Sequence, residues 1–508
     1  MRQTLPLLSL AMLAGCTVGP DYKGPPAVAS DAVGRGTFVR AGDPALTRTP
    51  GVARWWETLG DPTLTALVDD ALAHSPTIDA AQARIRAAEA QLRAQRAAGL
   101  PSVSASATYL HAQLPDVSLG GGSGNGGGSS GGQAQSLSSL DFFNLGGTAS
   151  WEPDLFGSAR RGTEQARATV GQRFADLADA QVSLSAQVAQ AYVALRDVQA
   201  RARLNARSTA LQRQALALQR QRLAAGTASQ LQVDRLQQQL ESTDAQNIPL
   251  AAQIDEYKGQ LAILTGRTPG ALDATLATDV PVPLPPREVP IGDPAALIAH
   301  RPDVRAAERA LAASNAQIGI NVAKTLPAVK FLGLFGLGGT SIADVVDPGK
   351  FTALLTPMLS WNVLDFGRAR AGVRQAEAQR DAADAQYRET VLEALQDAET
   401  SLSRFGNIRL QLAQLARAEA SATRAARLND LRVQAGTSTL IDQLDIERQR
   451  LSAVIAVAQG TAQLTGSYIA VQKALGLGWS DAAETGRPGG LATDRGGTAA
   501  RTGTGRSG

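Results

Sequence analysis

The chain has 508 residues, which is enough for several ordinary domains, but its composition favours an elongated helical protein over one large globular core. Aromatic residues make up only 4% of the chain, and Ala, Gln, Leu and Arg dominate, which is typical of long helices with a narrow hydrophobic seam. The formal net charge of +3 is too small to indicate a nucleic-acid surface. The sequence pI of about 9.1 therefore identifies no partner.

The N-terminus has the pattern of a secretory leader. A basic start and a Leu-rich run at 5–13 precede Leu-Ala-Gly-Cys, which ends at Cys16, the sole cysteine of the sequence. This pattern predicts a signal peptide over residues 1–15. The tetrad looks like a bacterial lipobox, so we expect cleavage before Cys16 and covalent lipid on it; the alternative is a chance cysteine after an ordinary leader.

Residues 16–60 are rich in Gly and Pro and have little to bury, so we expect a lipid-anchored extended arm. Asp61-Pro62 then predicts a helix start, with Asp as the cap and Pro in the first turn. After the leader, no run of about 18 apolar residues provides a transmembrane helix. Any membrane crossing would therefore use β-strands.

From residue 61 the chain repeats itself. The segment that begins His74-Ser-Pro is matched 226 positions later by one that begins His300-Arg-Pro. The segment that begins at Trp151 is matched 210 positions later at Trp361, and the same offset relates Gly226 to Gly436. The offset changes where the first copy carries an additional Gly- and Ser-rich stretch, which we interpret as an insertion in one flexible loop.

Each copy is predicted to contain a helix, two strands, a long helix, a turn and a shorter helix. The predicted first repeat is 61–270, with strands at about 102–114 and 144–153 and a long helix at about 157–225. The predicted second repeat is 293–479, with strands at about 328–338 and 352–363 and a long helix at about 365–434. Residues 271–292 are a predicted linker, and residues 480–508 a disordered tail.

The four predicted strands have roughly the ten residues that a tilted membrane strand requires. Val103, Ala105, Ala107 and Tyr109 alternate with Ser and Thr, although the second pair alternates less regularly. Aromatic residues at strand ends are candidates for the membrane interface; these are Phe142, Phe143, Trp151 and Trp361. The alternative is a small soluble sheet whose aromatic residues form a core.

The predicted long helices carry apolar residues at steps of three and four, as between Phe174 and Val198 and between Tyr387 and Leu415. This spacing indicates helices that wind around neighbours. The first long helix would span about 100 Å at 1.5 Å per residue. Four strands cannot close a barrel with a lumen, so we expect the chain to oligomerise.

These residues together resemble the TolC family of outer-membrane efflux proteins, in its lipoprotein branch with OprM-like and NodT-like members. The resemblance rests on Cys16-Thr-Val-Gly-Pro-Asp-Tyr, Trp55-Trp56, Asp61-Pro62, the doubled His-x-Pro and Leu-Pro elements, and Phe-Gly-x-x-Arg after each strand pair. It implies a mainly α-helical fold with a membrane β-barrel: a homotrimer with twelve strands in the barrel and twelve helices in a periplasmic tunnel.

The resemblance also implies the location and the partners. It implies the bacterial outer membrane, a periplasmic adaptor (a membrane fusion protein) and an inner-membrane pump of the resistance-nodulation-division class. Thr17 after the lipidated Cys16, in place of Asp, is similar to lipoproteins sorted to the outer membrane. No cofactor is expected beyond the lipid.

The aperture pattern of the family, Gly followed six and nine residues later by Asp, falls on Gly436, Asp442 and Asp445. In a trimer these acids would form two carboxylate rings, whose repulsion would raise some of their pKa values and strain the closed state. The alternative is two solvated helix-surface acids. Asp234, eight residues after Gly226, is a further candidate with a register difference of one.

The closing latch of the family does not carry over, because its Tyr and Arg correspond to Val433 and Ser438. His74 and His300 precede Pro at equivalent positions, and we interpret them as helix-start residues rather than metal ligands. The sequence holds no Cys/His cluster, phosphate loop or catalytic triad pattern. We therefore expect no enzyme and no metal site.

The predicted function is a passive exit duct for small molecules, gated at the periplasmic helical tip and opened by helix movement near Gly226 and Gly436. Two alternatives stay open at this point. One is an outer-membrane duct for type I protein secretion. The other is a non-channel lipoprotein that acts as a coiled-coil tether or adaptor.

Overall fold

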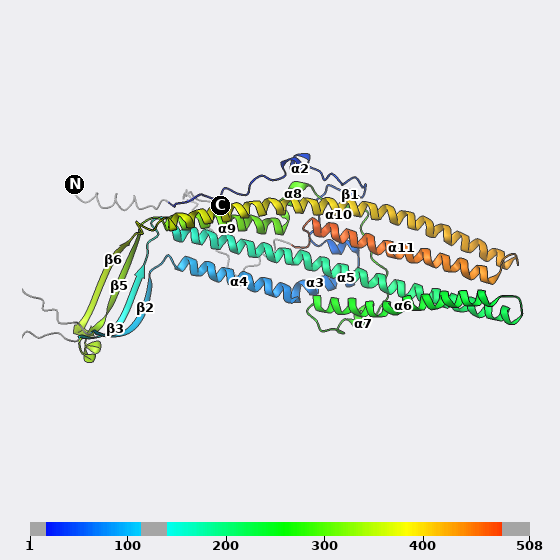
Figure 1. Ribbon diagram of the computed structural model, residues 1–508, viewed down its shortest axis with the longest axis horizontal. Coiled ribbons are helices and arrows are strands. Elements are labelled where there is room, and N and C mark those ends of the chain that lie inside the picture. The colour runs from blue at the N-terminus through cyan, green and yellow to red at the C-terminus, as the bar shows by residue number, and fades with distance from the viewer. Residues whose placement is uncertain (1–16, 113–139, 480–508) are drawn as a thin grey trace, which may run out of the picture.

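The computed structural model describes residues 17–112 and 140–479 as an elongated molecule (Figure 1). Four long strands lie at one end, and two long helical hairpins extend to the other. The predicted signal peptide, the lipidation site Cys16, the Gly-rich loop and the predicted disordered tail lie outside the described residues.

Helices dominate the described chain. In chain order the elements are α2 (Ser30–Arg35), β1 (Leu46–Thr47), η1 (Trp55–Leu59), α3 (Pro62–His74), α4 (Pro76–Ala97), β2 (Ser102–Ala112), β3 (Leu140–Trp151), α5 (Ser158–Ala224), α6 (Gln230–Leu264), α7 (Asp273–Leu276), β4 (Val289–Pro290), α8 (Pro294–His300), α9 (Pro302–Ala323), β5 (Ala328–Gly339), η2 (Ile342–Val346), η3 (Pro348–Lys350), β6 (Phe351–Ser360), α10 (Arg368–Gln434) and α11 (Leu440–Ala474).

Three pairs of corresponding helices in the two halves have equal lengths. The long helices α5 and α10 each contain 67 residues. The returning helices α6 and α11 each contain 35, and the helices before the strands, α4 and α9, each contain 22. Both hairpins therefore extend the same distance from the sheet, about 100 Å at the rise of an α-helix.

The long strands form one antiparallel sheet in the order β2-β3-β5-β6. Because side chains alternate between the two faces of a strand, the register assigns each residue to a face. One face is apolar or Gly across the middle of all four strands, and it carries Val103, Ala105, Ala107, Tyr109, Phe143, Leu145, Gly147, Ala149, Trp151, Val329, Phe331, Gly333, Phe335, Leu337, Phe351, Ala353, Leu355, Pro357 and Leu359. The other face mixes Ser, Thr, Asn and Gly with a few apolar residues.

The register explains the irregular alternation predicted for the second strand pair. Phe331 and Phe335 lie on the apolar face, whereas Leu332 and Leu334 lie on the mixed face. Two stacked aromatic pairs also lie on the apolar face: Tyr109 with Phe143 (centroids 4.8 Å apart) and Trp151 with Phe331 (5.8 Å).

One strand extends beyond its predicted limits, and one helix contains a proline. The second strand begins at Leu140 rather than at 144, because residues 140–143 pair with residues 109–112 of β2. The helix α6 passes through Pro249 and continues to Leu264. A proline inside a helix lacks a backbone donor and crowds the carbonyl four residues earlier, but α6 is in contact with α5 and continues as a helix.

Helices α4, α5, α9 and α10 lie side by side beyond the sheet. The long helix α5 contacts α4 on one flank and α9 and α11 on the other, whereas α10 contacts α9 and α11. An N-terminal strap, residues 17–59, runs over these helices. Arg161 of α5 pairs with Asp21 of the strap (2.6 Å), and Arg409 of α10 pairs with Asp43 (2.9 Å).

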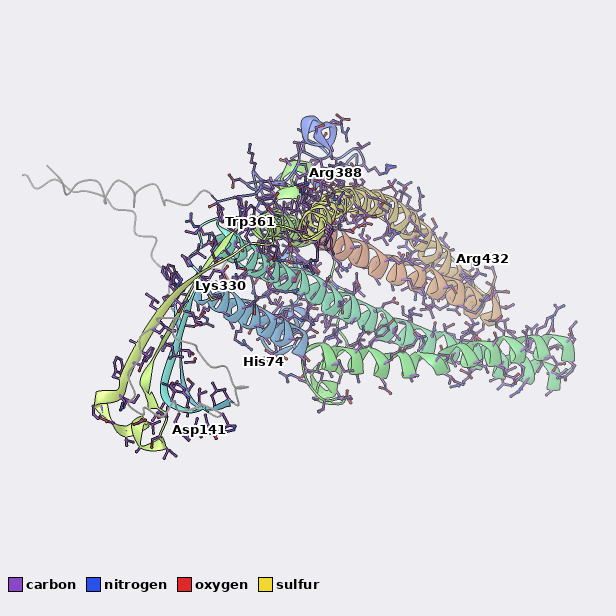
Figure 2. All side chains as sticks on the ribbon, turned by 60° about the vertical axis from the view of Figure 1, so that its left-hand side comes forward. His74, Asp141, Lys330, Trp361, Arg388 and Arg432 are labelled. Atoms are coloured by element: carbon purple, nitrogen blue, oxygen red, sulfur yellow. The ribbon has the colours of Figure 1, made fainter. Side chains whose placement is uncertain are left out.

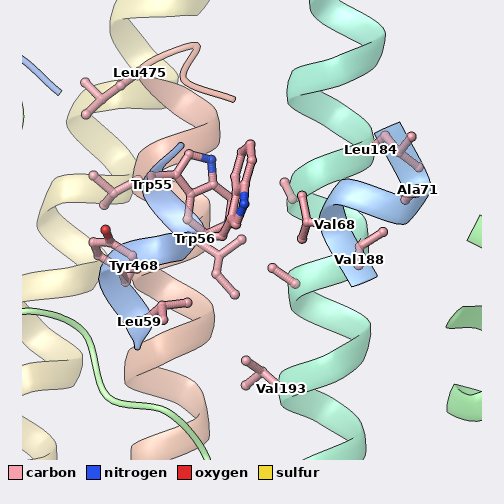
Figure 3. Packing of buried hydrophobic residues seen from close by; sticks show 14 of the residues in the cluster. Trp55, Trp56, Leu59, Val68, Ala71, Leu184, Val188, Val193, Tyr468 and Leu475 are labelled. Atoms are coloured by element: carbon pink, nitrogen blue, oxygen red, sulfur yellow. The ribbon is translucent and has the colours of Figure 1, made fainter. Parts of the chain in front are cut away.

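The predicted helix start at Asp61-Pro62 is present as the beginning of α3. The Asp61 carboxylate accepts the backbone N–H groups of Thr63 and Leu64, and it also accepts the hydroxyl of Tyr192 on α5 (2.6 Å). Beside it, η1 places two buried indoles between α5 and α11 (Figure 3). The largest buried side chains of the core thus lie halfway along the molecule.

No helix of the described ranges, 17–112 and 140–479, is both long enough and apolar enough to cross a bilayer.

Candidate functional site

The tips of the two helical hairpins, α5–α6 and α10–α11, lie at the end of the molecule farthest from the sheet (Figure 1). Each long helix ends at a glycine in the left-handed region, Gly226 (φ 74°) and Gly436 (φ 70°). Such a φ favours glycine because other residues are strained there. A Cβ on either glycine would meet no atom within 4 Å, so the requirement comes from the backbone alone.

The two turns close with the same hydrogen bonds. Thr227 N–H donates to the carbonyl of Arg222, and Thr437 N–H donates to that of Arg432, each at 2.8 Å. Both threonine hydroxyls donate to those same carbonyls. These are Schellman-type helix ends, and Figure 2 labels Arg432 at the tip of α10.

The returning helices begin with matching capping boxes. In α6, Ser229 and Gln232 exchange side-chain and backbone hydrogen bonds; in α11, Thr439 and Asp442 do the same. A capping box satisfies backbone donors that the helix start leaves free. Asp442, the first predicted gate acid, is therefore also the N3 residue of the capping box of α11.

Both predicted gate acids of the second hairpin have partners within their own chain. The exposed carboxylate of Asp442 accepts the Thr439 hydroxyl (2.7 Å) and its backbone N–H (3.3 Å). These hydrogen bonds, with the positive charge of Arg432 nearby, lower the pKa of Asp442. Asp445 pairs with Arg448 (2.8 Å) and accepts Gln449 (2.8 Å).

The first hairpin has no carboxylate at the positions equivalent to these acids. At the offset of 210, Gln232 corresponds to Asp442, and Arg235 corresponds to Asp445. The third predicted acid, Asp234, is exposed and accepts a hydrogen bond from Gln230 one turn earlier (2.7 Å). Fixed negative charge on this helix face is therefore concentrated in the second hairpin.

The interior of the first hairpin is apolar near its tip. Leu216, Val233 and Leu240 are buried there, with Leu223 and Leu236 packed against them. This cluster joins α5 to α6 within a few turns of the end. Apolar burial of this kind gives the hairpin its own small core.

The second hairpin is less apolar at the same places. The residues equivalent to Leu216, Val233 and Leu240 are Ala426, Gln443 and Arg450. Ser438 in the turn donates to Asn429 of α10 (2.8 Å), and Gln443 of α11 donates to Asp430 of α10 (2.7 Å). Hydrogen bonds also join α5 to α6, as from Gln219 to Gln232 (2.9 Å), but there they lie beside the apolar cluster. The amide nitrogen of Asn429 is buried without a partner. Such a hairpin has less apolar surface holding its helices together.

The different polarity of the two hairpin interiors is visible in the sequence when residues 210 positions apart are compared. The search for motifs did not make this comparison and missed the difference. The gate was predicted from the spacing of acids, whereas the interior polarity depends on which residues face the partner helix. Ser438 takes part in this polar interior through its hydrogen bond to Asn429.

The predicted interface aromatics lie at different places on the sheet. Trp151 ends β3, and its indole donates to the carbonyl of Gly99; Trp361 follows β6 and donates to Thr325 (3.2 and 3.3 Å). The two indoles thus make equivalent contacts at the sheet–helix junction, where Figure 2 labels Trp361. Phe143 lies toward the opposite end of the apolar face, whereas its neighbour Phe142 lies on the mixed face.

Among residues 17–112 and 140–479, no three His, Cys, Asp or Glu side chains are grouped to hold a metal ion. The interpretation of His74 and His300 as helix-start residues was wrong: His74 ends α3, and Ser75 is the N-cap of the next helix. His74 contacts Asp70 of its own helix at 3.0 Å. His300 likewise ends α8.

Comparison with known proteins places the chain among outer-membrane channels. The family model described as "Outer membrane efflux protein" matches residues 67–267 and 294–477. The chain is 27% identical to Nodulation protein T of Rhizobium leguminosarum bv. trifolii, with 96% of this chain and 99% of that protein covered. It is 28% identical to Outer membrane protein OprJ of Pseudomonas aeruginosa, with 94% and 95% covered.

Solved structures have the same fold. The outer-membrane channel OprN aligns with a TM-score of 0.80 and 31% identity over 91% of this chain and 100% of that one. The open state of the Neisseria gonorrhoeae MtrE outer-membrane channel aligns with a TM-score of 0.72 and 25% identity, over 91% and 98%.

Proposed function

The chain belongs to the outer membrane efflux protein family, and we propose that it is the outer-membrane channel of a tripartite efflux system. In this role it forms a passive exit duct for small molecules and catalyses no reaction. The observation that carries the proposal is the combination of a two-faced sheet with two equally long hairpins. The sheet suits a membrane, and hairpins of about 100 Å suit the depth of a periplasm.

The duct requires several copies of the chain. Within residues 17–112 and 140–479, neither β2 nor β6 pairs on its outer side, and a free strand edge favours pairing with another chain. We propose a homotrimer with a twelve-stranded barrel and a twelve-helix tunnel, in which each chain contributes two tandem repeats. The equal lengths of the corresponding helices support this arrangement.

The lipid anchor is proposed at Cys16. The next residue, Thr17, packs against Gly157 at the start of α5, where a Cβ would come within 2.7 Å of the Thr17 methyl. The backbone N–H of Val18 donates to Phe156 nearby (3.1 Å). The strap therefore begins at the sheet–helix junction, which supports attachment of the acyl chains at the membrane surface.

The proposed partners are a periplasmic adaptor and an inner-membrane pump of the resistance-nodulation-division class. Support comes from the relatives, several of which are named as outer membrane proteins of efflux pumps. The pump would supply the energy, because the chain itself offers only a conduit. The hairpin tips, at the far end from the sheet, are where an adaptor would meet the duct.

We place the gate at the tip of α10–α11. Three copies would present rings of Asp442 and Asp445 there, and such rings attract cations. The polar interior of this hairpin separates at lower cost than the apolar interior of α5–α6. Opening would therefore displace α10–α11, while α5–α6 keeps its shape.

Conductance of the purified protein in planar bilayers tests the gate. Asp442→Ala combined with Asp445→Ala should change conductance and weaken block by divalent cations, because both rings lose their charge. The matched control is Gln232→Ala with Arg235→Ala, the same two positions of the first hairpin, which should leave cation block unchanged. Unaltered block in the double Asp variant would remove these acids from the gate.

A further inference from the structure

The two strand hairpins, β2–β3 and β5–β6, differ on the mixed face of the sheet. The register places four large apolar side chains on that face of the second hairpin, here called the apolar stripe: Leu332, Leu334, Leu354 and Met358. The first hairpin has polar residues at the equivalent positions, which are offset by 226 or 210: Ser106, Thr108, Asn144 and Thr148. One half of the chain is therefore apolar where the other half carries hydroxyl and amide groups.

The residues of the apolar stripe are neighbours across two strands. Leu334 of β5 lies directly opposite Leu354 of β6. Leu332 lies opposite Thr356, so its diagonal neighbours on β6 are Leu354 and Met358. Diagonal side chains on one face of a sheet lie about 7–8 Å apart, which is within reach of long side chains. The stripe is thus one continuous patch and not a set of scattered apolar residues.

Within residues 17–112 and 140–479, the apolar stripe stays largely open. Leu332 is 48% exposed, Leu354 59% and Met358 52%, and Leu334 is half-buried. The extensive contacts of β5 are with β3, β6, η2 and η3, and those of β6 are with β5. The long helices pack against one another beyond the sheet and form the core there. The stripe is therefore not part of the core.

The surroundings of the stripe carry little charge. Across the described residues of β2, β3, β5 and β6, the mixed face has one charged side chain, Lys330, which lies opposite Met358. Its ammonium pairs with the Glu152 carboxylate (3.2 Å) at the helix end of the sheet, where Figure 2 labels Lys330. A face without net charge gives a small hydrated ion nothing in exchange for its water. Such a face suits a molecule whose own surface is apolar.

Neither the membrane nor a neighbouring copy would cover the stripe. In the proposed channel the apolar face of the sheet contacts lipid, so the mixed face lines the lumen. Neighbouring copies would pair at the free edges of the sheet and leave both of its faces open. The molecules that can reach the stripe are those that pass through the duct.

We propose that the apolar stripe is a transient binding site for small molecules with aromatic or aliphatic surface on their way through the barrel. This inference rests on the proposed channel and names a class of cargo that its wall holds. Contact with the stripe removes apolar surface of both partners from water, which is favourable without any specific hydrogen bond. Conduction requires such binding to be weak. An open stripe touches only one side of a molecule and satisfies this requirement.

Block of the pore by an apolar ion tests the stripe. The probe is tetraphenylphosphonium, whose charge is surrounded by phenyl rings, added to the purified protein in planar bilayers. Leu332→Ser with Leu334→Thr gives β5 the residues of β2 and should weaken this block about tenfold, because apolar contact with both leucines is lost. Tetramethylammonium carries the same charge with little apolar surface. Its block should be the same in this variant and in the unchanged protein.

The reverse exchange makes the test independent of folding losses. Ser106→Leu with Thr108→Leu gives β2 the leucines of β5 and should strengthen block by tetraphenylphosphonium, a gain that a damaged protein would not show. If neither variant changes this block, or if block by both ions changes in parallel, the stripe is overturned and the channel function stands. A protein that forms no conducting pore would instead refute the proposed channel, and the stripe with it.

Discussion

The two helical hairpins have the same shape and different interiors. Their long helices have equal lengths, their turns use glycines with the same φ, and their returning helices begin with the same capping box. Near the tip, however, the first hairpin has a buried cluster of leucine and valine in addition to its hydrogen bonds, whereas the second has Gln443 and Arg450 at two of the equivalent positions and is joined there by polar groups.

The two hairpins show that different residues determine the shape of a hairpin and its stiffness. The turn and caps fix where the chain reverses, because they satisfy the backbone groups at helix ends. The residues between the helices decide how readily those helices separate. Two hairpins with the same backbone conformation, α5–α6 and α10–α11, can thus differ in how easily their helices separate.

The largest expected effect comes from removing the apolar interior of the first hairpin. Leu240→Ala should destabilise the α5–α6 tip by about 2 kcal/mol, the lower end for a buried leucine, because the cluster is small. The matched change in the second hairpin, Arg450→Ala, should cost about 0.5 kcal/mol, because it removes an i,i+3 ion pair with Glu447 within one helix and opens no apolar cavity. Hydrogen exchange at the tips of the assembled protein measures both, and equal losses would contradict the difference in interiors.

A smaller effect should be the same in both hairpins. Gly226→Ala and Gly436→Ala each impose a positive φ on a residue with a Cβ, which costs about 1 kcal/mol. No atom lies close enough to add a clash at either position. Exchange of the amides in each turn should therefore quicken by a similar factor. A clear inequality would show that one turn carries strain beyond its backbone conformation.

The smallest expected effect is a pH dependence confined to the second hairpin. Hydrogen bonds from Thr439 lower the pKa of Asp442 in the folded chain, so its contribution to stability is complete above the unfolded pKa of about 4 and is lost as pH falls through the lower folded value. Tip protection of α10–α11 should stay constant from about pH 7 to 5 and fall only below about pH 4. The first hairpin, with Gln232 at this position, should show no such change.

Asp442→Asn is the control for this titration, because it keeps the shape of the side chain and removes its charge. Loss of protection already near pH 6 would contradict the prediction. It would indicate that repulsion between neighbouring copies raises the pKa of Asp442 more than the cap lowers it.

Several local features of the fold were predicted correctly from the sequence. The helix start at Asp61-Pro62 and the turns at Gly226 and Gly436 depend on local chemistry that a sequence displays directly. The resemblance to the efflux family is confirmed by the match to the family model. Such features can be predicted because a positive φ favours glycine and a helix start favours a capping side chain in any protein.

The features that sequence reading missed depend on distant partners. The residues from Phe331 to Leu337 were assigned to the apolar face and the mixed face of the sheet only when their pairing with β6 was known. The continuation of α6 through Pro249 depends on packing along α5, which outweighs the local preference of proline. The polar interior at Asn429 required knowing which side of α10 faces α11.

The equal lengths of the two hairpins limit how this protein can change in evolution. In the proposed trimer all six tips would end in one plane and offer the proposed adaptor a level rim. An insertion of one helical turn in α10 alone would lower three tips by about 5 Å and leave the other three behind. Length changes must then occur in both repeats together, whereas individual side chains along the helices remain free to vary.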